Sequence, residues 1–283
     1  MKPIPFKVPK SRQYSLRIQV DDGPHFYDQL HYHPEYQITA IQQGKGILYA
    51  GNGMVHFQEG DIFMIGANVP HLLKNAPVYF SETSPEVYAI SLFFDEYSFG
   101  QGFFEIHELQ KIKQLLADSK RVIKVTHATI LDNLLQIQKR VAEAIIIQFL
   151  QILSDLSETS KKFINSDYYQ LSIHESVGQR LNDIIRYSFE HLQETIRIEE
   201  VAEVAHLSRS QFSRYFKLHT GKTFIQFLNE LRVESACNLL LHEHYTIEQI
   251  CYEVGFQNLS NFNRQFRKSK GLTPSAYRKS YKA

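Results

Sequence analysis

The sequence is poor in cysteine and has no tryptophan, no apolar leader and no long apolar run. Its two cysteines, Cys237 and Cys251, do not have the spacing of a zinc module, so we expect small buried residues in a reducing cytoplasm. The N-terminal segment MKPIPFKVPKSRQ lacks the apolar core of a secretion signal. The most apolar segment, AIIIQFLQIL at residues 144–153, is too short and too interrupted to span a bilayer. These absences predict a protein with no membrane partner.

Charge is distributed unevenly along a chain whose size and composition suit a soluble protein of two domains. The chain has 283 residues, 43% of them apolar and 22% charged, and its net charge is +1. Residues 196–283 hold 13 Lys and Arg against 8 Asp and Glu, and none of these acids follows Glu253. Residues 1–195 hold the other 18 bases and 22 acids. The basic C-terminal end is the charge distribution expected for phosphate contacts.

The C-terminal part of the chain contains a repeat between residues 198 and 274. Ile198, Val201 and Ala202 recur 49 residues on as apolar residues, whereas positions from Phe212 onward recur at an offset of 50. The turn of the second copy therefore contains one extra residue. A repeated helix–turn–helix with no acid on its second helix predicts a reader of duplex DNA. The positions that recur are Phe212 and Phe262, Arg214 and Arg264, Phe216 and Phe266, Gly221 and Gly271, and Thr223 and Thr273.

Each copy carries the local signals of two short helices, at about residues 196–219 and 246–269. In the second copy, Thr246 with Gln249 forms a capping-box pattern, Gly255 ends the first helix, and Asn258 caps the next. In the first copy, Ser208 with Gln211 repeats the capping box. Residues 224–242 read as a helix that holds the two copies apart. Successive major grooves on one face of DNA lie roughly 34 Å apart, so each copy can enter one groove.

The outer faces of the two second helices are the predicted DNA-binding residues. The paired phenylalanines, four residues apart, face inward and leave polar residues outside. Asn reads adenine, and Arg reads guanine or phosphate. The alternative is ordinary helical packing with solvated polar faces, which the repeat and the charge make less favourable. The predicted set is Arg209, Ser210, Gln211, Ser213, Arg214 and Lys217 on one helix, and Asn258, Ser260, Asn261, Asn263, Arg264 and Arg267 on the other.

Residues 174–283 resemble the DNA-binding domain of the AraC/XylS family of transcriptional regulators. The run GFQNLSNFNRQFRKSKGLTPSAYRK at residues 255–279 is similar to that family's second helix–turn–helix signature over nearly its full length. The resemblance implies that the two predicted residue sets lie on recognition helices. It also implies binding to double-stranded promoter DNA and contact with RNA polymerase. Arg197 departs from the family, which has Ser or Thr at this helix cap, so the helix end is expected to be slightly weaker.

The front of the chain, from residue 12 to about residue 94, is rich in short β-strand patterns. Runs such as YQITAIQQ, GILYA, DIFMI and VYAISLFF are separated by turn signals. Many short strands at regular spacing predict a small antiparallel barrel, so the fold class is α+β with an all-α C-terminal domain. The turn signals are Asp22-Gly23, Gln43-Gly44, Asn52-Gly53 and Glu59-Gly60.

A group of histidines marks the barrel as a candidate binding site. His31 and His33 share a strand face, and His71 follows in GDIFMIGANVPH, which resembles the second cupin motif found at the front of AraC-family regulators. Cupin enzymes bind metal through His, His, Glu and His, but Gln37 occupies the Glu position here, and Glu35 lies two residues earlier. Three interpretations remain: an effector pocket, a metal site, or buried structural residues. We favour an effector pocket, without a metal or other cofactor, lined by His31, His33, Glu35, Gln37 and His71.

Between the two ends, helices are predicted. Residues 103–116 fit an amphipathic helix, and residues 129–156 carry a stronger apolar stripe, with Ile147 and Ile152 lying off it. One stripe can pack on the barrel, so a second apolar face favours a homodimer through residues 129–156; a single buried core helix is the alternative. Residues 157–173 read as a linker and residues 175–192 as a helix. The predicted parts are a sensing domain (1–100), a dimerisation segment (101–160) and a DNA-binding domain (174–283).

The sequence thus predicts a cytoplasmic, sequence-specific transcriptional regulator that acts as an activator under control of a small effector. The resemblance alone suggests a sugar or sugar derivative as the effector. No nucleophile–base arrangement, P-loop or dinucleotide fingerprint supports an enzyme. Two alternatives stay open: a metal-dependent cupin enzyme fused to a DNA-binding domain, and a regulator that acts without any ligand.

Overall fold

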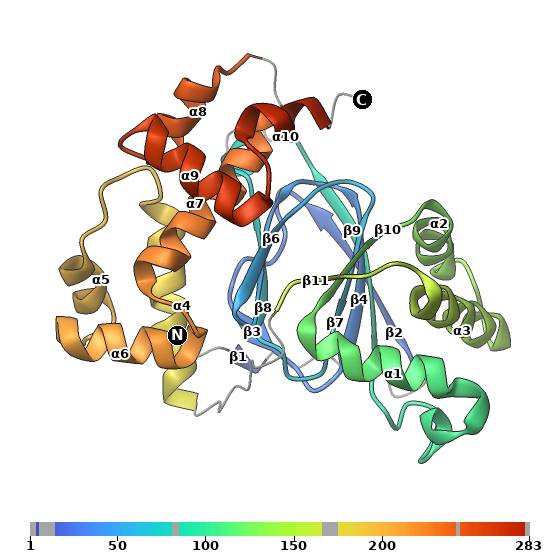
Figure 1. Cartoon of the computed structure of the whole chain (residues 1–283). Helices are drawn as coiled ribbons and strands as arrows, with labels where there is room; N and C mark the ends of the chain where they lie inside the picture. The colour runs from blue at the N-terminus through green and yellow to red at the C-terminus, as the bar shows by residue number, and fades with distance from the viewer. Residues whose placement is uncertain (1–3, 6–14, 81–84, 166–174, 242–243, 281–283) are drawn as a thin grey trace. The chain divides into compact units, whose positions relative to one another are not determined.

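The computed structural model describes residues 4–5, 15–80, 85–165, 175–241 and 244–280 of the chain. Residues 4–53 and 57–169 make one compact unit, and residues 170–283 make nearly all of the second. The first unit contains nearly all the strand residues and three α-helices, and the described residues from 175 onward, in the second unit, form helices and their connections (Figure 1). Among the described residues, no helix is both long enough and apolar enough to cross a bilayer.

Two β-sheets build the first unit, as the β-strand runs predicted. His71 of one sheet reaches Gln37 of the other, so the two sheets face each other across a common interior. The central pairs β4–β7, β4–β9 and β5–β8 are antiparallel. One sheet has the order β1 (Ile4–Pro5), β3 (His31–Tyr32), β8 (His71–Asn75), β5 (Gly46–Ala50), β6 (Gly53–Phe57). The other has the order β11 (Lys162–Phe163), β10 (Ile123–Thr126), β7 (Asp61–Ile65), β4 (Tyr36–Gln43), β9 (Val87–Phe94), β2 (Arg17–Gly23).

The turn signals are correct in three of four places. Turn residues lie at Glu59-Gly60 and at Gly51-Asn52, next to the predicted Asn52-Gly53, and a short connection from Gly44 follows the end of β4 at Gln43; Gly60 has a φ of 86° that suits glycine. The turn predicted at Asp22-Gly23 is wrong, because β2 continues through Gly23, which pairs with Val87. Long-range pairing with β9 therefore overrides a local turn signal.

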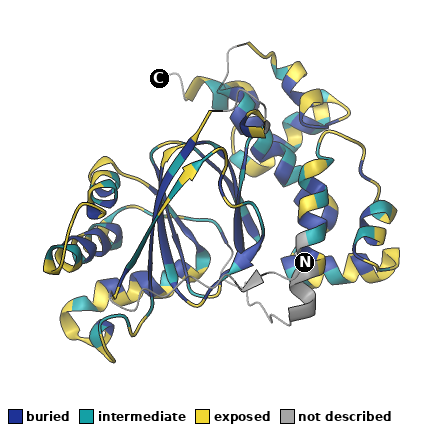
Figure 2. Ribbon diagram, turned by 180° about the vertical axis from the view of Figure 1, so that it is seen from behind, coloured by how far each residue is buried: buried dark blue, intermediate teal, exposed yellow. Residues whose placement is uncertain are grey.

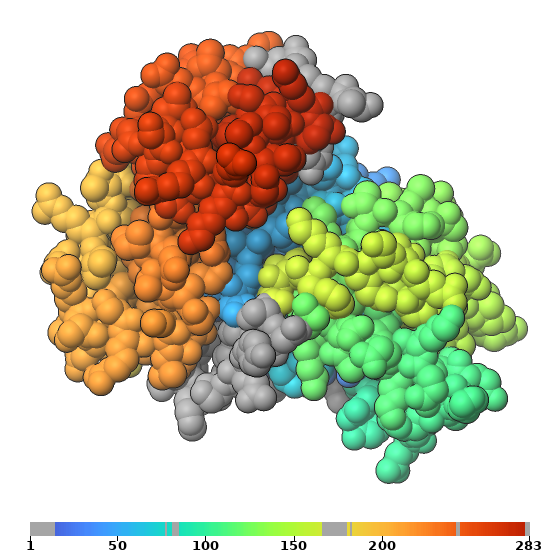
Figure 3. Space-filling view, in the orientation of Figure 1, coloured from blue at the N-terminus to red at the C-terminus, as the bar shows by residue number. Residues whose placement is uncertain are grey.

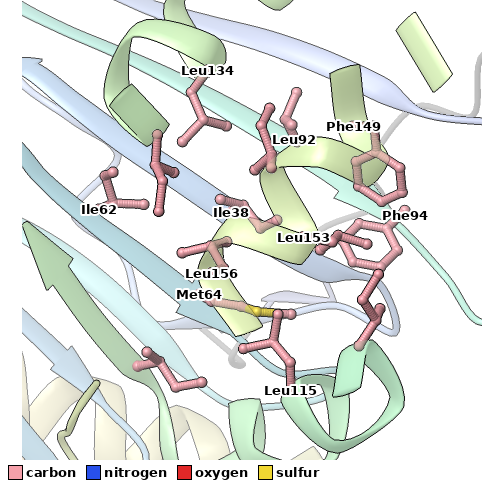
Figure 4. Close-up of a cluster of buried hydrophobic side chains, with 14 of the residues drawn as sticks. Ile38, Ile62, Met64, Leu92, Phe94, Leu115, Leu134, Phe149, Leu153 and Leu156 are labelled. Atoms are coloured by element: carbon pink, nitrogen blue, oxygen red, sulfur yellow. The ribbon is translucent and has the colours of Figure 1, made fainter. Parts of the chain in front are cut away.

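Three helices pack on the outer face of the larger sheet and close the core of this unit. The helices are α1 (Gln110–Asp118), α2 (Ala128–Ile137) and α3 (Glu143–Glu158). In Figure 4, Ile38, Leu92 and Phe94 from the strands point toward helical side chains such as Leu153 and Leu156. The ring of Phe149 meets that of Phe94 edge-on at 4.8 Å between centroids. Most of the apolar stripe predicted in this segment therefore covers the sheet, but Val141 and Ile146, which the prediction included, are exposed.

The helix boundaries predicted in this segment need correction. Residues 103–116 are not one helix, since two 3-10 turns (Phe103–Glu105 and His107–Leu109) precede α1. The stripe of residues 129–156 is divided between α2 and α3, and Ala142 before α3 has a positive φ of 50°. Ile152 belongs to the buried stripe rather than lying off it, because its side chain is fully buried.

The linker predicted at residues 157–173 begins later than expected. Helix α3 runs to Glu158, and β11 (Lys162–Phe163) pairs with β10 in the larger sheet. Arg121 stacks on the ring of Phe163 at 3.9 Å, which holds this edge strand in place. The rest of the predicted linker, residues 166–173, lies outside the described residues.

The second unit contains the two predicted helix–turn–helix copies. In the first copy, Phe212, Phe216, Phe224 and Phe227 pack with ring centroids 5.3–6.2 Å apart. In the second, Phe262 and Phe266 pack with both cysteines in one core. Figure 2 shows these buried faces in blue and the opposite faces in yellow. The helices are α4 (Glu175–Glu190), α5 (Ile198–Val204), α6 (Arg209–Thr220), α7 (Phe224–Leu240), α8 (Ile247–Glu253), α9 (Leu259–Lys270) and α10 (Pro274–Ser280).

Candidate functional site

Helices α6 and α9, the second helices of the two copies, have the caps that the sequence predicted. Ser208 accepts a hydrogen bond from the backbone N–H of Gln211, and the Gln211 side chain accepts one from the backbone N–H of Ser208. In α9, Asn258 accepts from the backbone N–H of Asn261 at 2.8 Å. Both helices are 12 residues long, about 18 Å, and both end at a glycine with a left-handed φ. The two copies therefore present helices of the same length and the same ends.

The turns inside the two copies differ by one residue, as the change of offset predicted. Four residues separate α5 from α6 and five separate α8 from α9, from their bounds 198–204, 209–220, 247–253 and 259–270. The second residue of each turn is left-handed: His206 (φ 54°) in the first copy and Gly255 (φ 88°) in the second. A Cβ on Gly255 would lie 2.4 Å from the carbonyl oxygen of Leu192, so only glycine fits there. His206 adopts the same conformation at a steric cost.

The predicted DNA-binding residues lie where the sequence places them. Asn261 and Asn263 are half-buried, and the other ten are exposed. Several of them already have partners on the surface, among them Gln211 in its capping box, Arg209 with Glu199 at 3.0 Å, and Arg264 with Asn261 at 2.8 Å. Arg214, Lys217 and Arg267 make no ion pair with any residue of the described part of the chain. The exposed polar face is thus present on both helices.

Two lysines near these helices are neutralised by acids of α7. Lys222 pairs with Glu230 at 2.5 Å, and Lys270 pairs with the buried Glu234 at 2.6 Å. These two lysines stabilise the unit through ion pairs, and each adds little net positive charge to its surface. Among the described residues, the outer faces of α6 and α9 keep exposed cations without an acidic partner, such as Arg214, Lys217 and Arg267.

Two arginines outside the prediction hold the helical frame. Arg232 on α7 donates to the carbonyls of Leu192 and Glu194, just after α4. Arg278 on α10 donates to the carbonyls of Leu240 and Tyr245, at the end of α7. Arg278 satisfies the carbonyl of Leu240, which the end of α7 leaves without a helical partner, and the other three carbonyls belong to the connections between helices. The spacing of the two arginines carries no local signal, because each acts across about 38 residues of sequence.

In the barrel, the structure brings together all three predicted histidines. His31 pairs with His71 across β3 and β8, and ring centroids in the group lie 4.3–6.0 Å apart. Each Nδ1 donates to a backbone carbonyl, that of Gln29 for His31, Glu35 for His33 and Val69 for His71. A carbonyl only accepts, so the Nδ1 atoms carry the protons and the Nε2 atoms of neutral rings do not.

Gln37 joins the histidines to two buried hydroxyls. Its Oε1 lies 3.0 Å from Nε2 of His33 and 2.9 Å from Nε2 of His71. Its Nε2 donates to Thr39 at 2.7 Å, and the hydroxyls of Thr39 and Ser91 lie 2.9 Å apart. Thr39 and Ser91 were not predicted, although Thr39 follows Gln37 by two residues and so shares its strand face.

Burial sets the charge of this cluster. Desolvation lowers the pKa of His31 to about 4, and it also lowers the pKa values of His33 and His71 below the ordinary range. The imidazoles are therefore neutral at pH 7. Glu35 lies close by, with its Oε2 3.7 Å from Nδ1 of His33; this oxygen is buried and has no hydrogen-bond partner among the described residues.

A row of polar side chains on β2 belongs to the same interior but was missed. Arg17 donates to Gln19 at 2.9 Å, and Gln19 donates to Asp21 at 2.7 Å. These residues pair across from Phe93 and Ser91 of β9, on the face that Gln37 shares. Burial raises the pKa of Asp21. Their alternation at every second position was the signal that could have identified an inward polar face.

Comparison with known proteins gives matches at both ends of the chain. Residues 14–83 match the family model described as "AraC-like ligand binding domain", and residues 201–280 match the model described as "Helix-turn-helix domain". The Bacillus subtilis HTH-type transcriptional regulator YdeC is 24% identical, over 89% of this chain and 87% of its own. The HTH-type transcriptional activator RhaS of Escherichia fergusonii is 23% identical, over 88% and 86% of the two chains. These relatives are transcriptional regulators rather than enzymes.

Among solved structures, the DNA-binding domain of AdpA in complex with a target DNA is similar to the C-terminal part. It is 32% identical, covers 36% of this chain and 93% of its own, and gives a TM-score of 0.35.

Proposed function

This chain belongs to the AraC family of DNA-binding transcriptional regulators and carries the AraC-like ligand-binding domain of that family, and we propose that a small effector bound in the barrel controls its action at promoters. The domain roles proposed are sensing by residues 1–100, assembly by residues 101–160 and DNA binding by residues 174–283. The observation that carries the proposal is the pairing of two similar exposed polar helices with a barrel whose interior is polar.

On DNA, α6 and α9 enter successive major grooves. Arg214, Lys217 and Arg267 support this because they are exposed and free of acidic partners within the described chain. Arg209 can exchange Glu199 for phosphate, since an exposed ion pair contributes only about 0–1 kcal/mol. Base contacts come from the side chains that share these faces, Ser210, Gln211, Ser213, Asn258, Ser260, Asn261, Asn263 and Arg264.

The effector site uses the cluster of His31, His33, Glu35, Gln37 and His71. Its support is an interior with several buried polar groups from two facing sheets. One relative is named as an activator, and we infer the same sign here, through contact with RNA polymerase in the cytoplasm.

The chain acts as a homodimer through α3. The buried stripe of this helix covers the sheet, yet Val141, Ile146 and Ile147 beside it are 75%, 37% and 67% exposed. In Figure 3 the lime segment that contains α3 forms part of the visible surface. Exposed isoleucines on a helix whose other face is buried favour a second copy as the partner.

Sedimentation of an Ile147→Glu variant tests the dimer. The variant should sediment as a monomer and keep the thermal stability of a folded chain, because Ile147 is exposed. Ile225→Glu is the matched control, since Ile225 is also exposed (47%) but lies outside residues 101–160, and it should stay dimeric. A dimeric Ile147→Glu variant would contradict an interface on α3.

A thermal-shift screen of the full-length protein against sugars, small metabolites and divalent metals tests the sensor. A true effector at about 100 times its dissociation constant adds roughly 2.7 kcal/mol of stability. His33→Ala should lose this gain, and His107→Ala, an exposed histidine outside the barrel site, should keep it. The same effector should change the affinity for promoter DNA. An unchanged DNA affinity and unchanged promoter output with every bound ligand would refute control by the barrel.

A further inference from the structure

The three histidines converge through one side of each ring. Their ligand nitrogens all lie within 4.8 Å of one another, and His31, His33 and His71 are all buried. The Nδ1 of each ring is anchored on a backbone carbonyl at 2.8–3.0 Å. A backbone anchor on one nitrogen fixes the tautomer and orients the other nitrogen, which is the outer-shell arrangement found around metal-bound imidazoles.

Gln37 makes the convergence more specific. Its amide oxygen lies 2.9–3.0 Å from the Nε2 atoms of His33 and His71. With Nδ1 protonated, these Nε2 atoms carry lone pairs, so three acceptor atoms face each other with no proton between them. Buried acceptors persist in such an arrangement only when a positive partner lies between them; without one, the amide must turn over.

Glu35 places a carboxylate beside the cluster, where it also faces the charge of Arg17. Its Oε2 is buried without a hydrogen bond among the described residues, at 3.7 Å from the Nδ1 of His33. A carboxylate behind a histidine raises the basicity of that ligand and compensates the charge of a bound cation.

We propose that His31, His33 and His71, with the amide oxygen of Gln37, bind one divalent transition-metal ion. Imidazole nitrogens suit Zn²⁺, Fe²⁺, Ni²⁺ and Cu²⁺, and a neutral donor set of this kind disfavours Ca²⁺ and Mg²⁺. Three nitrogens and one oxygen are enough for a four-coordinate site.

The amide of Gln37 couples ion binding to the barrel wall. With the ion present, Oε1 faces the ion and the NH₂ group donates to Thr39 and Ser91, at 2.7 and 3.4 Å. Without it, the amide turns over, NH₂ donates to the two Nε2 atoms, and Thr39 donates to the amide oxygen. The hydroxyls rotate to suit either state, so both arrangements satisfy every group. Loss of the ion therefore reverses the hydrogen bonds that link β4 to β9.

This site does not depend on the proposed function. The further idea that the ion is the effector rests on the proposed function, because an effector must change the affinity for DNA. Ion binding and DNA affinity are separate measurements, so the two proposals can fail separately.

The test uses the full-length chain without a histidine tag, stripped of metal by a chelator and then dialysed. Titration with Co²⁺, followed by visible absorption, and with Zn²⁺, followed by calorimetry, should give one ion per chain. His71→Ala should weaken binding at least about tenfold. His107→Ala, which removes an exposed histidine elsewhere, should leave the affinity unchanged.

Gln37→Glu keeps all three histidines, so it tests the metal site even if His71→Ala fails to fold. A carboxylate in place of the amide oxygen should tighten binding of Zn²⁺ at least about tenfold. The proposal is overturned if the wild-type chain binds no ion, or if His71→Ala folds and binds with wild-type affinity. It is also overturned if Gln37→Glu leaves the affinity unchanged. If DNA affinity is the same with and without the bound ion, the ion is not the effector, but the metal site itself is not contradicted.

Discussion

Replacing Arg264 by Ala tests whether α9 reads bases. Arg264 is exposed, and its side chain bonds to Asn261 three residues earlier on the same helix. A surface pair at this spacing contributes about 0.2–0.5 kcal/mol to stability. The variant should therefore fold normally, with a melting temperature lowered by no more than about 2 °C.

The loss on DNA should be much larger than the loss in stability. A guanidinium on a base edge provides about 1–3 kcal/mol of discrimination, so affinity for the preferred sequence should fall by about 5- to 150-fold. The loss should concentrate at one base pair. Binding to duplexes already changed at that base pair should fall much less.

Fluorescence anisotropy with a site selected from a random duplex pool, and with each single base change, measures this. Lys268→Ala removes the same charge from the same helix, where Lys268 is exposed. It should weaken all duplexes together and lower the salt slope by about 0.9 if it contacts phosphate. If Arg264→Ala behaves like Lys268→Ala, with a uniform loss at every base, Arg264 does not read a base.

Three further predictions concern stability, measured by urea unfolding. His206→Gly should stabilise the protein by about 0.5–1 kcal/mol and Gly255→Ala should destabilise it by more than about 1 kcal/mol, because both positions are left-handed; changes of the same sign would contradict this. Phe149→Ala should lower the free energy of unfolding by about 3–5 kcal/mol, and a loss below about 1 kcal/mol would contradict the packing of α3 in the core. In chelator, stability should fall as the pH drops below about 6.5, because the unfolded chain binds the proton first. His31, whose pKa in the folded chain is about 4, contributes up to about 1.4 kcal/mol per pH unit between these two values, and His31→Asn should reduce this slope.

The helical half of the fold was readable because its signals are local. Ser208, Thr246 and Asn258 cap the helices that the sequence assigned to them, and Gly255 occupies the turn. The break between α2 and α3 was missed because the apolar stripe stays in phase across it, while Ala142 carries the irregular backbone. Strand β8 was missed because its five residues form a strand only by pairing with β5 and β3.

The candidate sites also differ in whether local sequence signals or long-range pairing position their residues. The outer faces of α6 and α9 follow from helical periodicity within a dozen residues. The histidine cluster could be suspected from sequence, but its hydrogen bonds depend on register: His31 opposite His71, and Thr39 opposite Ser91. Arg232 and Arg278 act on distant helix ends, and no local pattern indicates such partners.

Methylation protection of guanines, by the full-length protein on its selected DNA site, tests most directly that each chain reads DNA with both helices. We expect two protected major-groove segments per chain, about 10–10.5 base pairs apart. Arg214→Ala should weaken one segment, and Arg264→Ala the other. A single protected segment that responds to only one of these variants would contradict the account.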